Sequence, residues 1–241
     1  MNIPWLDSDT VSFPPPNQAL AEPNGLLAAG GGLSVEWLTT AYRQGIFPWY
    51  EAGQPILWWS PDPRLILTPD AFRISRSLNK LLKKHEYMVS FDTSFSQVVH
   101  RCGAIGRGEA ETWITSDMVL AYTNMHKSGL AHSVEIWSND SLVGGLYGVA
   151  LGKVFFGESM FSLEDNTSKL ALCYLTRHLK EWGFELIDCQ VSSEHLITLG
   201  AINISREEYN CKLAELTSTK DRIGKWEINF DLFTNANEYK L

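Results

Sequence analysis

Several common signals are missing from this chain of 241 residues, and each absence argues against a class of protein. The first residues, 1–7, contain neither a basic stretch nor an apolar stretch, so we expect no signal peptide. No apolar run is long enough to span a bilayer. The sequence also lacks a Gly-x-x-x-x-Gly-Lys phosphate-binding motif and a cluster of metal ligands. We therefore expect no membrane association, no cofactor and no metal.

Cysteine is scarce, and the four cysteines at positions 102, 173, 189 and 211 form no C-x-x-C pair. Without an export signal, we expect free thiols in a reducing cytosol, and neither disulfides nor a zinc site. The net charge of −8 argues against a molecule that is basic all round. It leaves room for nucleic-acid binding through a local basic face.

The first part of the chain is rich in loops, with short regular elements between them. Cap and stop signals predict helices over residues 34–45 and 75–85. Alternating apolar residues predict a short strand over residues 87–91. These elements suggest a small N-terminal α+β domain of residues 1–92.

The remainder, residues 93–241, has clearer periodicity and predicts a larger α+β domain. A helix capped by Ser116 is expected first, then an antiparallel meander of three strands. Ser205 and Glu208 form a capping box for the last helix. The predicted elements are helix 116–129, strands 133–137, 142–149 and 153–156, helix 167–183, strand 185–190 and helix 205–216.

Polar side chains near two strand ends are candidates for chemistry. On strand 185–190, alternation places Asp188 and Gln190 on one face and Cys189 on the other. An acid and an amide so placed could hold an amine and position a proton acceptor, although a helix cap and a satisfied loop backbone explain the pair equally well. Glu158 follows the third meander strand and a glycine, where we expect a tight turn. By itself it would be a surface carboxylate.

The combination of motifs resembles one family. Gly157-Glu158-Ser159-Met160-Phe161-Ser162 and Asp188-Cys189-Gln190 closely resemble the signature of the leucyl/phenylalanyl-tRNA–protein transferases. The other motifs that follow the family order are Gly45–Trp49, Trp58–Arg64, Thr112–Ile114, Ala131–Glu135, Leu142–Gly148 and Ser168-Lys169. The resemblance extends from about residue 13 to residue 216. It implies a C-terminal domain with an acetyltransferase-like fold, in which helices cover a mostly antiparallel sheet.

The resemblance also implies an activity. Members of the family transfer leucine or phenylalanine, and methionine more weakly, from aminoacyl-tRNA to the α-amino group of proteins that begin with Arg or Lys. The product is marked for degradation in the cytoplasm. The expected partners are therefore the aminoacyl-tRNA and the acceptor protein. By analogy, Asp188 and Gln190 accept the proton of the amine and orient it, while Glu158 and Asp188 supply negative charge near the cationic N-terminus.

The family pattern assigns binding residues as well. Trp49 and Trp113 match positions that stack on the terminal adenosine of the tRNA. The positions that match the side-chain pocket are Leu146, Phe155, Met160, Leu172, Leu175 and Ile187. The candidates for phosphate contacts, which share one helix face, are Arg76, Lys80, Lys83 and Lys84. Ordinary core packing is an alternative explanation for the two tryptophans and the six apolar pocket residues. An ordinary solvent-exposed helix face is the alternative explanation for the four basic residues.

Two other classes of function remain alternatives. A serine hydrolase is suggested because Gly157–Phe161 is one residue short of G-x-S-x-G, and Ser159, Asp188 and His195 follow the α/β-hydrolase order. A cysteine nucleophile at Cys189 paired with His195 is a weaker version of the same idea. A non-catalytic module that binds tRNA or protein N-termini would need the tryptophans and the basic helix, but neither Asp188 nor Gln190.

Overall fold

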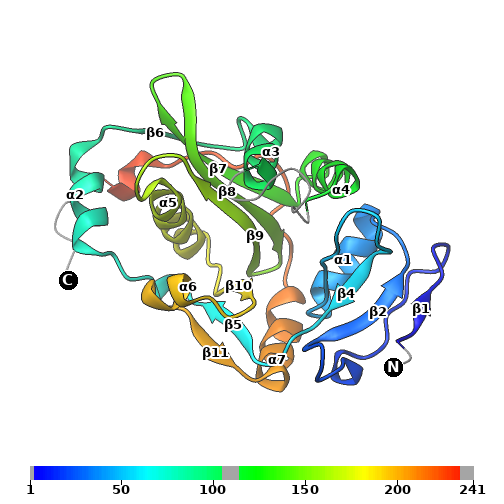
Figure 1. The fold of residues 1–241 in the computed structure, drawn as a ribbon. Helices are drawn as coiled ribbons and strands as arrows, with labels where there is room; N and C mark the ends of the chain where they lie inside the picture. The colour runs from blue at the N-terminus through cyan, green and yellow to red at the C-terminus, as the bar shows by residue number, and fades with distance from the viewer. Residues whose placement is uncertain (1–2, 105–113, 234–241) are drawn as a thin grey trace.

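A computed structural model describes residues 3–104 and 114–233 of the chain. Its strands form two sheets (Figure 1). The four-stranded sheet has the order β1 (Trp5–Leu6), β2 (Leu26–Gly30), β4 (Leu57–Trp59), β3 (Phe47–Pro48). The seven-stranded sheet has the order β11 (Ile202–Ile204), β5 (Arg64–Leu67), β10 (Leu186–Gln190), β9 (Val154–Ser162), β8 (Ser141–Leu151), β7 (Ala131–Ser138), β6 (Met88–Phe91). The expected α+β class is confirmed.

Several helices begin at a side-chain cap that the sequence offers. Ser34, Ser75 and Ser205 each accept a hydrogen bond from a backbone N–H in the first turn of the helix that follows. The predicted cap at Ser116 is wrong by one residue, because Thr115 accepts that bond. The helices are α1 (Val35–Arg43), α2 (Arg76–Lys84), α3 (Phe95–Ala104), α4 (Ser116–Lys127), α5 (Thr167–Glu181), α6 (Glu194–Thr198) and α7 (Arg206–Thr217). Three short 3-10 helices are Pro16–Gln18, Pro69–Ala71 and Phe230–Phe233.

Helices cover both faces of the seven-stranded sheet, with α5 on one face and α3 and α4 on the other (Figure 1). One hydrophobic core lies under α5 and includes Leu172 and Leu175. A second core joins the four-stranded sheet and α1 to α3, α4 and α7, and it buries Trp58 and Tyr122 completely. The two sheets are therefore packed together through a shared apolar interior.

The division between the sheets falls between β4 and β5. Because β5 and β6 belong to the seven-stranded sheet, the domain boundary expected at residue 92 does not coincide with this division. Nearly every neighbouring pair in the large sheet is antiparallel, as expected for the meander. Among the described strands of this sheet, only β9 and β10 pair in parallel. None of the helices in the described ranges is long and apolar enough to cross a membrane.

Candidate active site

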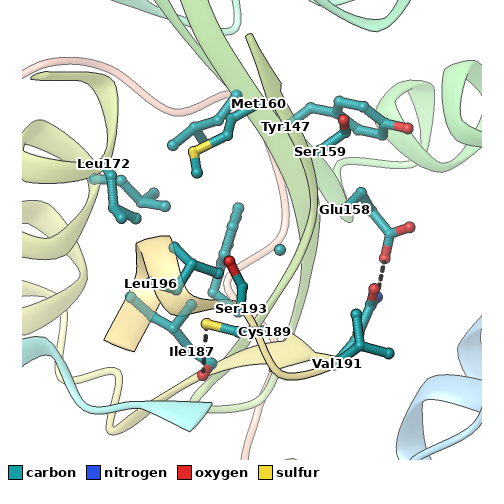
Figure 2. A pocket seen from close by; sticks show the side chains of 15 residues that line it. Tyr147, Glu158, Ser159, Met160, Leu172, Ile187, Cys189, Val191, Ser193 and Leu196 are labelled. Carbon is teal, nitrogen blue, oxygen red and sulfur yellow. Dashed lines mark hydrogen bonds between the residues drawn. The ribbon is translucent and has the colours of Figure 1, made fainter. Parts of the chain in front are cut away.

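The parallel strands β9 and β10 diverge in the middle of the seven-stranded sheet, and the candidate site lies at the point of divergence. Their pairing ends at Asp188 opposite Phe156. Two residues further along each strand stand Glu158 on β9 and Gln190 on β10. The Nε2 atom of Gln190 donates a hydrogen bond of 3.1 Å to Oε1 of Glu158 across the gap (Figure 2). The splayed strands thus bring an amide and a carboxyl group together.

The backbone of Glu158 differs from the sequence prediction. We expected a tight turn after the third strand, but β9 continues to Ser162 and Glu158 lies inside it. On the neighbouring strand β8, Gly148 pairs with Gly157 and Tyr147 pairs with Ser159. Glu158 is the extra residue of a β-bulge, the irregularity by which a strand changes the direction of one side chain.

Two buried tyrosines hold the Glu158 carboxyl group. Tyr42 from α1 donates to Oε1 at 2.6 Å, and Tyr122 from α4 donates to Oε2 at 2.5 Å. The two hydroxyl oxygens lie 2.7 Å apart. Burial raises the pKa of Glu158 to about 7, although the hydrogen bonds from Tyr122 and Tyr42 lower it. At neutral pH this carboxyl group can therefore both accept and release a proton.

A cavity of about 220 Å³ opens beside Glu158 and Gln190. All six residues predicted for the side-chain pocket line it: Leu146, Phe155, Met160, Leu172, Leu175 and Ile187. The remaining lining residues are Tyr147, Gly157, Ser159, Cys189, Val191, Ser193 and Leu196, together with Glu158 and Gln190 themselves. Figure 2 shows Met160, Leu172 and Leu196 around one space, and the hydrogen bond of Glu158 on the other side of the β9 ribbon. The cavity suits an apolar group attached to a polar reacting centre.

The sequence analysis did not identify several residues of the site. No sequence motif linked Tyr42 and Tyr122 to Glu158, because they lie 116 and 36 residues from it along the chain. Ser193 and Leu196 follow the Asp188-Cys189-Gln190 motif closely. Their closeness to this motif in the sequence was the one feature that could have identified them as site residues.

Asp188 lies on the other side of β10 and does not line the cavity. It is completely buried and forms an ion pair with Arg64, whose Nε and Nη2 donate at 2.8 and 2.6 Å. Tyr209 and the backbone N–H of Gln190 also donate to it, at 2.8 and 2.9 Å. Burial by itself would lower the pKa of the Arg64 guanidinium, but Asp188 and Tyr209 hold that pKa above its ordinary value.

The shared face predicted for Asp188 and Gln190 agrees with their contacts. Asp188 accepts from Tyr209, and Gln190 donates to Glu158, which Tyr42 and Tyr122 hold. The three tyrosines belong to the same core, the one that joins α1, α4 and α7. Gln190 has a φ of 63°, and the pairing with β5 shifts between these two residues. The strand pairing becomes irregular there, but the side chain of Gln190 still reaches Glu158. Cys189 lies on the face opposite Asp188, as expected, and lines the cavity together with Ile187.

The geometry does not support the hydrolase alternatives. Within the described residues, the hydrogen bonds of Asp188 go to Arg64, Tyr209 and Gln190, and none connects it to His195. A Ser-His-Asp arrangement is therefore not formed. The pKa of the Cys189 thiol is raised, chiefly by burial and also by Asp188, which disfavours the reactive thiolate.

Of the predicted tRNA-binding residues, Trp49 and the four basic residues lie within the described ranges, and none of these five lines the cavity. Trp49 is 42% exposed, and its ring centroid is 5.7 Å from that of Trp59, whose Nε1 donates to the Trp49 carbonyl oxygen. Trp113 lies outside the residues that the structure describes. All four predicted basic residues are exposed on α2, which packs on α5 at the far end of the molecule from the four-stranded sheet (Figure 1).

The fold and the site define an α+β protein that can hold an apolar group in a cavity, with an ionisable carboxyl group at the cavity edge. Comparison with family models gives two matches. Residues 66–214 match the leucyl/phenylalanyl-tRNA protein transferase model, and residues 31–62 match the N-terminal domain model of the same family. The chain belongs to this family of aminoacyltransferases, which confirms the resemblance found in the motifs.

Individual relatives agree with the family match. The leucyl/phenylalanyl-tRNA–protein transferase of Nitrosospira multiformis is 54% identical over 224 residues, which cover 93% of this chain and 96% of the relative. The protein of that name from Pseudomonas fluorescens is 55% identical over 207 residues, or 86% of this chain and 92% of the relative. Among solved structures, the chain is similar to a GCN5-related N-acetyltransferase from Kribbella flavida, with a TM-score of 0.40 and 12% identity over 68% of this chain and 58% of that one.

Proposed function

We propose that this protein transfers leucine or phenylalanine from aminoacyl-tRNA to the α-amino group of cytoplasmic proteins that begin with Arg or Lys, and so marks them for degradation. Membership of the family supports the transfer itself. The observation that carries the mechanism is the position of Glu158 and Gln190, joined by a hydrogen bond, at the edge of a single apolar cavity.

The cavity holds the side chain of the donor amino acid. Its lining is mostly apolar, and α5 contributes Leu172 and Leu175 from one helix face. Once the side chain is buried there, the ester carbonyl lies at the edge of the cavity, next to Glu158 and Gln190. Positioning of the two substrates at this edge supplies much of the rate acceleration.

Glu158 accepts the proton of the attacking amine as the C–N bond forms, and returns it to the leaving ribose oxygen of the tRNA when the ester C–O bond breaks. An α-amino group has a pKa of roughly 8, so a carboxyl group with a pKa of about 7 is matched to it. In the ionised state, Tyr42 and Tyr122 both donate to Glu158, and no proton is left for the contact between their hydroxyls. When Glu158 is protonated, it can donate to one tyrosine, which then donates to the other. The hydrogen bonds of Glu158, Tyr42 and Tyr122 can therefore rearrange to accommodate the additional proton.

Gln190 orients the amine. Its Nε2 donates to Glu158, which leaves its carbonyl oxygen to accept a hydrogen bond from the amine. Asp188 acts indirectly in this scheme, because it fixes the Gln190 backbone N–H and neutralises Arg64. The negative charge that favours a cationic acceptor then comes from Glu158, since the charge of Asp188 is balanced by its partner.

Trp49 and α2 hold the tRNA. The exposed Trp49 ring offers a stacking surface for the terminal base, and base stacking on an aromatic side chain typically contributes about 1–3 kcal/mol. The basic face of α2 would meet phosphates farther along the tRNA. Trp113 belongs to the same proposal as a second stacking residue.

Transfer of radiolabelled leucine from leucyl-tRNA to a peptide tests the proposal. A peptide that begins with Arg should become labelled, and a matched peptide that begins with Asp should not. Equal labelling of both would contradict the acceptor site, and no labelling of either would contradict the proposed function.

A further inference from the structure

One wall of the cavity comes from the end of β10 and the segment that follows it. Cys189 on β10 and Val191 begin this wall, and Ser193 and Leu196 continue it toward and into α6. The opposite wall, from β8, β9 and α5, belongs to the hydrophobic core under α5. Figure 2 shows the Leu196 side chain directed into the space between Met160 and Leu172. Leu196 therefore limits the cavity from the side that is not part of the sheet.

The main chain at Leu196 is firmly held, although α6 is short. The Leu196 carbonyl oxygen accepts from the N–H groups of Leu199 and Ala201, both at 3.0 Å. Leu199 and Ala201 are themselves buried, and the carbonyl of Leu199 accepts from the N–H of Arg73 at 2.8 Å. The backbone of this wall is thus anchored at its C-terminal end. A change of side chain at position 196 should alter the shape of the cavity without moving the helix.

We propose that Leu196 is a specificity-determining residue, whose side chain limits the space for the donor amino acid and favours leucine over phenylalanine. This inference rests on the proposed transfer from aminoacyl-tRNA. The other side chains of this wall, Cys189, Val191 and Ser193, are smaller, so Leu196 is the bulkiest group that the wall contributes to the cavity. An apolar pocket discriminates by size, and a single methylene changes kcat/KM by roughly 10–200-fold.

The test compares donors that differ only in the amino acid. One tRNA is charged chemically with leucine or with phenylalanine, and kcat/KM for transfer to a peptide beginning with Arg is measured for each. In Leu196→Ala, the ratio of phenylalanine to leucine transfer should rise by about tenfold or more relative to wild type. In Leu196→Phe, which fills the space, the ratio should fall by a similar factor.

A matched control is available on the same helix. Ile197 is 40% exposed and does not line the cavity, so Ile197→Ala should leave the ratio unchanged. Thermal melting shows whether each variant is folded. If Leu196→Ala is not folded, Leu196→Phe is compared with the size-conserving Leu196→Met. Leu196→Phe should lower the ratio of phenylalanine to leucine transfer, and Leu196→Met should preserve it. An unchanged ratio in both Leu196→Ala and Leu196→Phe, or an equal change in Ile197→Ala, would overturn the inference. Absence of transfer by wild type would instead overturn the proposed function.

Discussion

Replacing Glu158 by glutamine removes the proposed proton acceptor and preserves its shape. A glutamine side chain can still accept from Tyr42 or Tyr122 and remain in contact with Gln190. What it cannot do is take up a proton near neutral pH. A general base typically contributes 10²–10⁴-fold to a rate, so we expect single-turnover transfer by Glu158→Gln to be about 10²–10⁴-fold slower. Affinity for the donor should stay nearly constant, because the apolar cavity is intact.

The pKa of Glu158 also predicts how the transfer rate changes with pH. Burial raises the pKa of Glu158 to about 7, so the carboxyl group is protonated and inactive as a base below that pH. The α-amino group of the acceptor must also lose a proton, with a pKa of roughly 8. The logarithm of the wild-type rate should therefore rise with a slope of about two below pH 7 and about one between pH 7 and 8. The Glu158→Gln variant should show a slope of about one throughout this range.

The assay is a rapid-quench measurement with enzyme in excess over leucyl-tRNA, from about pH 5.5 to 9. Tyr122→Phe is a useful companion variant, because it removes one donor to Glu158 and keeps the carboxyl group. Loss of that hydrogen bond should move the lower inflection to higher pH, since the bond lowers the pKa of Glu158. The reasoning is refuted if Glu158→Gln reacts at the wild-type rate or keeps both inflections.

Three further changes test other parts of the account. Asp188→Asn leaves Arg64 buried without its counter-ion, so the free energy of unfolding measured in urea should fall by about 3–5 kcal/mol. Trp49→Ala should raise the apparent KM for leucyl-tRNA, by the equivalent of about 1–3 kcal/mol if a base stacks there. Neutralising Arg76 and Lys80 together should weaken tRNA binding and reduce the slope of log affinity against log salt by about two at most.

The Asp188 and Trp49 variants each have a control elsewhere in the chain. Glu185→Gln breaks an exposed ion pair with Lys153, and should change the unfolding free energy by less than about 1 kcal/mol. Trp5→Ala removes a tryptophan that is 71% exposed on β1, and should leave the KM for leucyl-tRNA unchanged. If the controls change as much as the variants, the assigned roles of Asp188 and Trp49 are wrong.

Local elements were predictable because their causes are local. The helix over residues 34–45 was found from its serine cap and terminal glycine, and the structure has α1 at Val35–Arg43. The meander was found from alternation, although β9 runs past the predicted end at residue 156 to Ser162. A bulge was not predictable there, because an extra residue in one strand is defined only by its pairing with the next strand.

The chemistry of the site depends on contacts between distant residues. The resemblance to a family pointed to Glu158 and Gln190 as candidates, but nothing local indicated that Tyr42 donates a hydrogen bond to Glu158. The role expected for Asp188 took no account of Arg64, which lies 124 residues away along the chain and pairs with the Asp188 carboxylate in the core. Pairings at such separation leave no periodic signal in a single sequence.

The crystal structure of a complex with a non-hydrolysable leucyl-adenosine would test the central claim most directly. The account predicts that the leucyl side chain occupies the cavity between Leu172 and Leu196, with its carbonyl group within hydrogen-bond reach of Glu158 or Gln190. A leucyl group bound outside this cavity, or a carbonyl carbon beyond reach of both residues, would contradict it.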